Sequence, residues 1–478
     1  MNPNPLKATA LAAATLATAL LAWVPAAQAQ SNDELIKELR ALRQRVDDLE
    51  ARLKTAPPAK PADDAATQWG MTPQQVQDFN RIAVKTEALE DAMEAYGLKN
   101  LKISGYADPT YLFNQRQNRA GIQFLNPVAL DGYNYDNSYF GGATLDFQKE
   151  MEGGSKWRLT LTPNRGAGSV IGDGSVVHEA SMSIPLDDLQ TRFIAGQIPD
   201  WSGYEYQPAT LNKLITHNLL FDFTLPAAYT GAGMEITRGK WIAKWLLDNV
   251  NSSKRGASER APALSYRVDY AKGEFQGFGF AGVHGKAANA RTESASPVGG
   301  VAYKARDSRL DLFEADGYFI RGDLTVQGQL SYGAQKQAAI TADPVTGALR
   351  DAHWWGASTL LAYKFIPRWE AVGRLDYLNN SKNGGGLLGY TAADSRNGIG
   401  PDATLVCDPA VAGNPAGCDK GANRMALSLG LSFLYNLNTT FKAEARFDNA
   451  SLPVFLDVRT GQYRKSNALF GSSVVVSF

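Results

Sequence analysis

The sequence has few of the residues and segments on which several protein classes depend. Its 478 residues include two cysteines and four histidines, and 48 basic residues balance 48 acidic ones. The lack of a basic excess argues against a nucleic-acid-binding protein. Because the histidines are far apart and outside any recognisable nucleophile motif, we expect no enzyme, no metal site and no cofactor.

Long apolar runs are absent after the N-terminus, so we expect no transmembrane helix in the mature chain. The N-terminus itself has the parts of a secretory signal peptide. Lys7 supplies a positive charge, "ALAAATLATALLAWVPA" supplies the apolar segment, and "AQA" supplies the cleavage site. Residues 1–29 are therefore predicted to be removed. An uncleaved membrane anchor is the alternative, which the shortness of the apolar run disfavours.

Export would place the two cysteines, Cys407 and Cys418, in an oxidising compartment. Both lie in one stretch rich in glycine, proline and aspartate, "CDPAVAGNPAGC". This pattern predicts a disulfide that closes a small loop. Two unpaired thiols are the alternative.

The segment after the cleavage site has a helical apolar period. Its apolar residues are separated alternately by four and three positions, which is the spacing of coiled-coil core positions. They are Leu35, Leu39, Leu42, Val46, Leu49 and Leu53. Residues 30–54 are predicted to form a periplasmic coiled coil, with a single amphipathic helix as the alternative. A Pro/Ala-rich linker, residues 55–71, follows, and a second helix is predicted over residues 72–98 from a capping box of Thr72 and Gln75.

From residue 101 the apolar period changes to two. In the first such segment Ile103, Tyr111 and Phe113 share one face, and polar residues occupy the other. Sixteen such segments reach to residue 478, and short connections alternate with long ones. An even strand number with this alternation predicts an all-β fold, a 16-stranded antiparallel transmembrane β-barrel over residues 101–478. Pro109 interrupts the first strand, where we expect a bulge, and the first long connection is expected over residues 115–138.

The last strand, "ALFGSSVVVSF", ends the chain on an aromatic residue. Phe470, Val474, Val476 and Phe478 are predicted to face lipid. An apolar terminal strand is required if it pairs with the first strand and closes the barrel.

The third long connection, roughly residues 198–228, combines polar groups with aromatic anchors. We expect it to fold into the barrel and constrict the lumen. A loop packed over the barrel entrance or a neighbouring subunit is the alternative. The constriction candidates are Tyr204, Glu205, Asn212, Lys213, His217 and Asp222.

Alternation also predicts charges on the lumen face of the strands. The pore-wall candidates are Asp108, Arg158, Arg192, Lys244, Arg267, Arg374, Lys442 and Arg446. Acidic and basic residues are interleaved along these strands, which favours small hydrated solutes and biases ion choice only weakly.

Four stretches carry a resemblance to a known family: "SGYADPTYLFN", "GQIPDWSGYE", "FTLPAAYTGAGMEI" and the terminal "VVVSF". The chain resembles Gram-negative outer-membrane porins, most closely an uncharacterised proteobacterial porin-like family with an N-terminal coiled coil, and more loosely the phosphate-selective porins. It lacks the density of arginines and lysines of the last group.

The resemblance implies a homotrimer of water-filled barrels in the outer membrane, with the N-terminal segment in the periplasm. Lipid and lipopolysaccharide would surround the barrel, and the terminal strand with Phe478 would be the signal that the barrel-assembly machinery recognises. Peptidoglycan is a candidate partner for the N-terminal segment. The predicted function is passive diffusion of small hydrophilic solutes or ions. A structural outer-membrane protein with a loop-closed lumen is the alternative.

Overall fold

The structure is a computed structural model, and it describes most of the chain from residue 72 onward. The described residues are 72–125, 140–163, 176–251, 262–287, 308–339, 343, 345–380, 382, 399–406 and 415–478. The predicted signal peptide, coiled coil and linker lie outside them, and so does Cys407. The chain divides into two units, Met1–Ala95 and Tyr96–Phe478.

Helix α3, Pro73–Ala95, is the described part of the first unit. It begins at the expected capping box: the Thr72 amide donates to the Gln75 side chain at 2.9 Å, and the Gln75 amide donates to the Thr72 hydroxyl at 3.3 Å. These bonds satisfy amide groups that the first helical turn leaves without partners. Among the described helices, none is both long enough and apolar enough to cross a bilayer.

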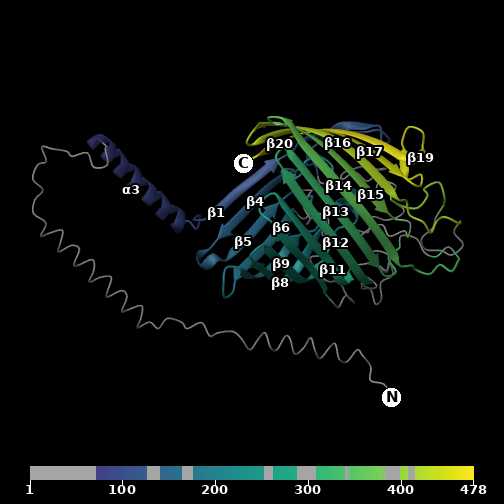
Figure 1. The fold of residues 1–478 in the computed structure, drawn as a ribbon, viewed down its shortest axis with the longest axis horizontal. Coiled ribbons are helices and arrows are strands. Elements are labelled where there is room, and N and C mark those ends of the chain that lie inside the picture. The colour runs from purple at the N-terminus through teal and green to yellow at the C-terminus, as the bar shows by residue number, and fades with distance from the viewer. Residues whose placement is uncertain are drawn as a thin grey trace, which may run out of the picture. The chain divides into compact units, whose positions relative to one another are not determined.

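The second unit is a closed antiparallel β-barrel (Figure 1). Its wall segments are β1 (Leu101–Ala107), β2 (Thr110–Asn114), β3 (Arg119–Gln123), β4 (Ala143–Glu150), β5 (Lys156–Leu161), β6 (Val177–Pro185), β7 (Thr191–Pro199), β8 (Ala228–Arg238), β9 (Trp241–Val250), β10 (Ala263–Ala271), β11 (Gln276–Ala287), β12 (Ser308–Arg321), β13 (Leu324–Gln335), β14 (Ala352–Ile366), β15 (Trp369–Asn379), β16 (Arg424–Asn436), β17 (Thr439–Ala450) and β20 (Ser466–Ser477). β1 with β2, and β3 with β4, each make one wall strand, so the wall has 16 strands, as the sequence predicts.

The terminal strand closes the barrel. β20 pairs with β17 on one side and with β1 and β2 on the other, all antiparallel. Phe478 continues this pairing beyond the strand, because its amide and carbonyl exchange hydrogen bonds with Gly105 at 3.0 and 3.2 Å. No edge remains, so the backbone groups of the wall pair with a neighbouring strand.

The first two wall strands differ from the sequence-based expectation. The ladder of the first strand is broken at Asp108 and Pro109, and the pairing of its partner is interrupted at the same level, between Gln123 of β3 and Ala143 of β4. The Asp108 carboxylate accepts hydrogen bonds from the amides of Gly141 and Gly142, at 3.1 and 2.5 Å. It thus connects the two strands at the position where their ladder is broken. The expected bulge is therefore a break in both strands. The expected first long connection is wrong in part, since β3 lies within it and residues 115–118 form a short turn.

The short connections lie at the opposite end of the strands from the long loops. They include the two-residue turns between β8 and β9 and between β12 and β13, where Gly239 and Gly322 both have a φ of 58°. Glycine adopts this left-handed conformation without steric cost. The last long loop contains a small hairpin that the sequence pattern does not predict, β18 (Phe455–Asp457) with β19 (Gln462–Arg464).

Side chains alternate between the two faces of the wall. On β14, Trp354 points inward and is 1% exposed, whereas the next residue, Trp355, points outward and is 46% exposed. Phe470 and Val476 on β20 and Phe478 beyond its end are exposed, whereas Val474, the fourth residue predicted to face lipid, is half-buried. An outer surface of exposed Leu, Phe, Val, Trp and Tyr suits contact with lipid and would be unfavourable in water.

Rings cluster on the outer face near the short turns. One series runs from Trp241 through Tyr270 and Phe278, with ring centroids 4.8 and 5.3 Å apart, and another joins Trp369 to Phe433 at 4.7 Å. Such a girdle marks one boundary of the apolar band in outer-membrane barrels.

Candidate functional site

The connection between β7 and β8, residues 200–227 and here called the inward loop, packs against the inner face of the barrel. Its helix α5, Leu219–Phe223, contacts β14 and β15. The Asn218 side chain caps this helix by accepting from the Phe221 amide at 2.8 Å. We call the inner faces of β13–β17, which the loop covers, the anchoring wall.

Arg374 of β15 is the centre of the attachment. Its guanidinium forms an ion pair with Glu205 of the loop at 2.7 Å and donates to the carbonyl oxygens of Thr216 and His217 at 2.7 and 2.9 Å. Arg446 of β17 donates to the same His217 carbonyl at 2.6 Å. Two strands thus hold one turn of the loop through charged donors, which make stronger hydrogen bonds than neutral ones.

Glu444 of β17 completes this attachment from the acidic side. Its carboxylate accepts from the amides of Ile215 and Thr216, both at 2.8 Å, and from the Thr216 hydroxyl at 2.6 Å. Nearby, Lys442 donates to the carbonyl of Asn212 at 2.6 Å. The wall therefore supplies partners for loop backbone groups that would otherwise be buried without hydrogen bonds.

Three more loop residues have partners on the anchoring wall. Lys213 pairs with Glu370 at 2.8 Å, the Tyr204 hydroxyl hydrogen-bonds to Ser358 at 2.5 Å, and Asn218 donates to Gln329 at 3.1 Å. Of the six constriction candidates, Tyr204, Glu205 and Lys213 thus have side chains directed to the wall.

Of the remaining candidates, Asn212 and His217 have side-chain contacts within the loop. The Asn212 amide bonds within the loop, to the backbone of Tyr206, and contacts the His217 ring nitrogen at 3.0 Å. The His217 ring stacks on Phe221 with centroids 4.0 Å apart. Asp222 is 1% exposed.

Apolar packing reinforces the attachment. Leu219, Leu220 and Phe223 join a buried cluster with inward residues of the strands, including Trp354 and Leu378. Two wall glycines leave room for the loop: a Cβ at Gly430 would lie 2.2 Å from Leu214, and one at Gly356 would lie 2.9 Å from Leu220.

Burial raises the pKa of two loop carboxyl groups. The pKa of Asp222 is raised from 3.8 to about 7 by desolvation, against the opposing effect of Arg446, Arg424 and Arg374. Desolvation also raises the pKa of Glu205, and the facing Arg374 opposes this. Both groups lie where a buried charge is expensive unless it is paired.

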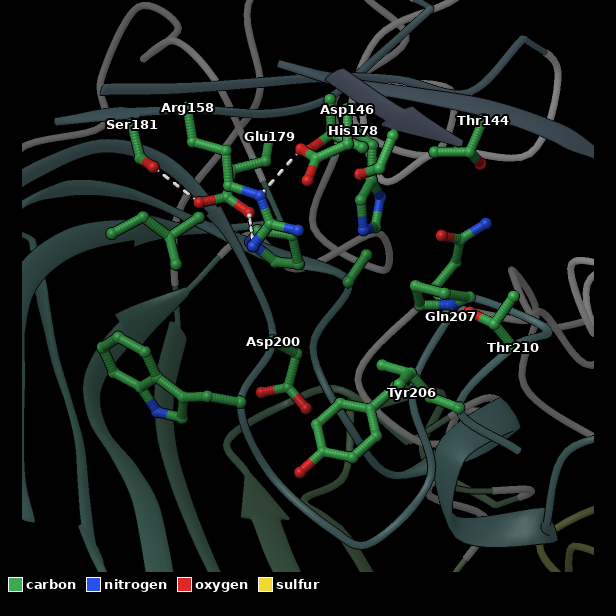
Figure 2. A pocket seen from close by; sticks show the side chains of 18 of the residues that line it. Thr144, Asp146, Arg158, His178, Glu179, Ser181, Asp200, Tyr206, Gln207 and Thr210 are labelled. Carbon is green, nitrogen blue, oxygen red and sulfur yellow. Dashed lines mark hydrogen bonds and ion pairs between the residues drawn. The ribbon is translucent and has the colours of Figure 1, made fainter. Parts of the chain in front are cut away.

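The opposite half of the barrel interior is open. A cavity of about 730 Å³ lies between the inward loop and the strands β1 and β4–β9 (Figure 2). We call it the open cavity. It reaches from Ser104 and Tyr106 on β1 to Lys244 on β9.

The wall of the open cavity carries a group of three charges. Arg158 of β5 lies between two carboxylates, with Asp146 of β4 at 2.8 Å and Glu179 of β6 at 3.1 Å (Figure 2). Thr160 donates to Asp146 at 2.7 Å, and Ser181 donates to Glu179 at 2.5 Å. The Arg158 side chain is 43% exposed, whereas the side chains of Asp146 and Glu179 are 10% and 12% exposed.

The inward loop faces this group with uncharged and aromatic side chains. Tyr206, Gln207 and Thr210 line the cavity, as does Trp201, over whose ring the Lys244 ammonium lies at 4.8 Å. Asp200 is the charged loop residue in the lining. Desolvation raises its pKa from 3.8 to about 6, although hydrogen bonds from Tyr229 and Ser202 oppose the rise.

The structure separates the pore-wall candidates into groups. Arg158 and Lys244 line the open cavity, whereas Arg374, Lys442 and Arg446 lie behind the inward loop. The other three lie elsewhere on the inner face: Arg192 donates to Ser183, Arg267 pairs with Asp316, and Asp108 caps the break in the first strand.

Several residues of the open cavity were not singled out from the sequence. Asp146 and Glu179 follow the same alternation as the named charges, so the pattern could have found them. Gln207 and Thr210 lie in an irregular loop, where no period indicates which side chains face the cavity.

Within the described residues, no group of three or more His, Cys, Asp or Glu residues is arranged to hold a metal ion. Cys418 is disulfide-bonded. The second cysteine of the predicted pair, Cys407, lies outside the described residues.

A closed 16-stranded antiparallel barrel with an apolar outer face, a polar interior and an inward loop defines a porin-like transmembrane β-barrel. Within this class the chain belongs to the DUF3138 family, described as a protein of unknown function, whose model matches residues 6–478.

Solved structures with a similar fold are outer-membrane proteins. A loop L8 deletion mutant of OmpT from Vibrio cholerae is 11% identical, with a TM-score of 0.47, over 79% of this chain and 99% of that one. An anion-selective porin from Comamonas acidovorans is 11% identical, with a TM-score of 0.46 and the same coverage. OmpF of Salmonella typhi, in complex with daunomycin, is 10% identical, with a TM-score of 0.47, over 79% and 97%. No curated protein sequence matches the chain.

Proposed function

We propose that the protein is an outer-membrane porin that lets small hydrophilic solutes or ions diffuse passively through its barrel. The observation that carries the proposal is the open cavity, which lies beside the inward loop and whose lining combines charged, amide and hydroxyl groups with apolar side chains such as Ile198, Trp201 and Phe221. Water and hydrated solutes are stable against the polar part of this lining, whereas a wholly apolar core would exclude them. In this proposal the inward loop narrows the lumen and sets the size limit.

The attachment of the loop supports this role. A constriction must keep its shape while solutes pass, and the loop is held by ion pairs and hydrogen bonds to the strands of the anchoring wall. Backbone groups of residues 215–217 bond to Arg374, Glu444 and Arg446. A loop held in this way is expected to have one conformation rather than many.

Self-association as a homotrimer is part of the proposal. On α3 the apolar residues Phe79, Ile82, Leu89 and Met93 have coiled-coil spacing, and they are 60%, 59%, 61% and 38% exposed. An isolated helix with an exposed apolar seam gains stability when copies pack together.

In the proposed topology α3 lies in the periplasm, where peptidoglycan is a candidate partner. Lipopolysaccharide and the barrel-assembly machinery are the other proposed partners.

The competing function is a structural outer-membrane protein with a closed lumen. The filling of the other half of the barrel by α5 and its apolar cluster favours it. The two functions differ in whether solutes cross.

Deleting residues 205–220 tests the role of the loop. We expect the deletion to raise single-channel conductance, because it removes the segment that bounds the open cavity on one side. Folding of the variant is checked by its heat-modifiable mobility in gels. Unchanged conductance in a folded variant would contradict the constriction.

A further inference from the structure

The basic residues inside the barrel are divided unequally between its two halves. Arg374, Arg424 and Arg446 are 1%, 1% and 0% exposed, and Lys442 is 8% exposed. They lie on the anchoring wall, where the inward loop covers them. A solute in the open cavity therefore does not contact them.

The charges of the three covered arginines are also compensated locally. Arg374 pairs with Glu205 and Asp376, and Asp448 pairs with both Arg424 and Arg446. Compensated and covered charges contribute little to the field in a neighbouring water-filled space. Three of the bases that the sequence assigns to the pore wall, Arg374, Lys442 and Arg446, thus attach the loop.

The open cavity has the opposite balance. Its lining includes four carboxylates, Asp146, Glu179, Asp200 and Glu235, against two basic side chains, Arg158 and Lys244. The lining also includes the imidazole ring of His178, which is 6% exposed. At pH 8 an ordinary histidine is neutral, so the lining has an excess of negative charge.

Neither base is available as a free positive charge. Arg158 is held between Asp146 and Glu179, so that this group of three has one net negative charge. Lys244 lies over the Trp201 ring and is opposite Glu235 in the β8–β9 ladder. The loop side of the lining adds Asp200 and no base.

We propose that the open cavity selects small hydrated cations over anions, and that Asp146, Glu179 and Asp200 set this preference. The proposal rests on the proposed porin function and names its solute class. Carboxylates lining a narrow aqueous space between low-dielectric walls concentrate cations and repel anions. The arginines and lysines behind the loop do not offset this effect.

The test is the reversal potential of the purified full-length protein in planar bilayers under a KCl gradient at pH 8. We expect a potential of the sign that K⁺ permeation produces. The double variant Asp146→Asn/Glu179→Gln leaves Arg158 without its partners, so we expect the K⁺/Cl⁻ permeability ratio to fall several-fold. Asp200→Asn should lower the ratio without disturbing the wall group. The matched control is Glu274→Gln, which removes one carboxylate from the exposed turn between β10 and β11.

A reversal potential near zero or of the anion sign in the wild type would overturn the cation preference and leave the porin function standing. A wild-type ratio that Asp146→Asn/Glu179→Gln and Asp200→Asn do not change, in channels that still conduct, would also overturn it. Absence of channels in the wild type would contradict the proposed function, and the cation preference with it.

Discussion

Arg374 shows how one side chain can fix the position of the loop that occupies part of the lumen. Its guanidinium is buried and bonds to Glu205, to two loop carbonyl groups and to Asp376 of its own strand. A buried guanidinium without these partners would be very unfavourable. The loop and the arginine therefore depend on each other.

Replacing Arg374 with alanine should release the loop. The substitution leaves Glu205 and Asp376 buried without their partner, a loss of roughly 3–5 kcal/mol for a broken buried pair. We expect a lower unfolding temperature and a higher, noisier single-channel conductance. Arg321→Ala, at the exposed end of β12, is the matched control and should leave both unchanged. Wild-type conductance in the folded Arg374→Ala variant would show that other contacts suffice to hold the loop.

Asp222 should make stability depend on pH. Its pKa in the folded protein is about 7, against an ordinary value of 3.8. The folded state thus binds this proton more tightly, so the group contributes stability below pH 3.8 that is lost as the pH rises through about 7. We expect the unfolding temperature to fall between about pH 5 and about pH 8.

Asp222→Asn should remove much of this pH dependence, because asparagine does not titrate. Asp187→Asn, in the exposed turn between β6 and β7, is the control and should preserve it. The measurement is the gel-mobility unfolding temperature at several pH values. An equal slope in wild type and Asp222→Asn would show that another group is responsible.

At the residue scale the sequence predicts which strand side chains point inward but not what they contact. Alternation places Arg374 and Arg158 on the same inner face, and only the path of the inward loop distinguishes their roles. Glu205 and Arg374 are 169 positions apart in the sequence. The other contacts between the inward loop and the anchoring wall also join residues that are far apart in the sequence. No local pattern encodes contacts at such separations.

At the element scale, β20 both ends the chain and closes the barrel. It pairs with β17 along nearly its whole length and with β1 and β2 on its other side. The Phe478 ring lies over Gly105 of β1, since a Cβ at that glycine would be 2.9 Å from the ring. The terminal residue thus covers a gap in the outer face of the first strand.

Phe478→Ser should lower the yield of folded protein in the outer membrane. It removes the ring over Gly105 and, in the proposal taken from the family resemblance, the recognition signal for the barrel-assembly machinery. The control is Phe441→Ser, which removes an exposed ring from the neighbouring strand β17. A larger loss for Phe478→Ser, in heat-modifiable protein from outer membranes, is the expected result. Equal losses of yield for the two variants would contradict the role of Phe478 as a recognition signal and leave only its contribution to closing the barrel.

Strands were predictable as elements because their period of two and their turns are local properties. The first two wall strands are harder to predict, because the pairing is interrupted in both, at Asp108 and Pro109 in one and between β3 and β4 in the other. The sequence pattern places β3 in a loop, because five residues are too few to show a period. The β18–β19 hairpin has three residues per strand and gives no signal for the same reason.

At the scale of the whole molecule, the barrel interior has two halves with different chemistry. One half contains the inward loop and α5, which bond to β13–β17, together with an apolar cluster that also includes inward residues of β7–β12. The other half is the open cavity against β1 and β4–β9. The proposed function depends on the second half being a continuous path for water, and the competing structural role depends on its being closed.

Single-channel recording of the wild-type protein in planar bilayers tests this central claim most directly. A water-filled passage in a trimer of barrels predicts stepwise increases in conductance, with steps grouped in threes. Membranes that contain folded, heat-modifiable protein and show no steps above background would contradict the account.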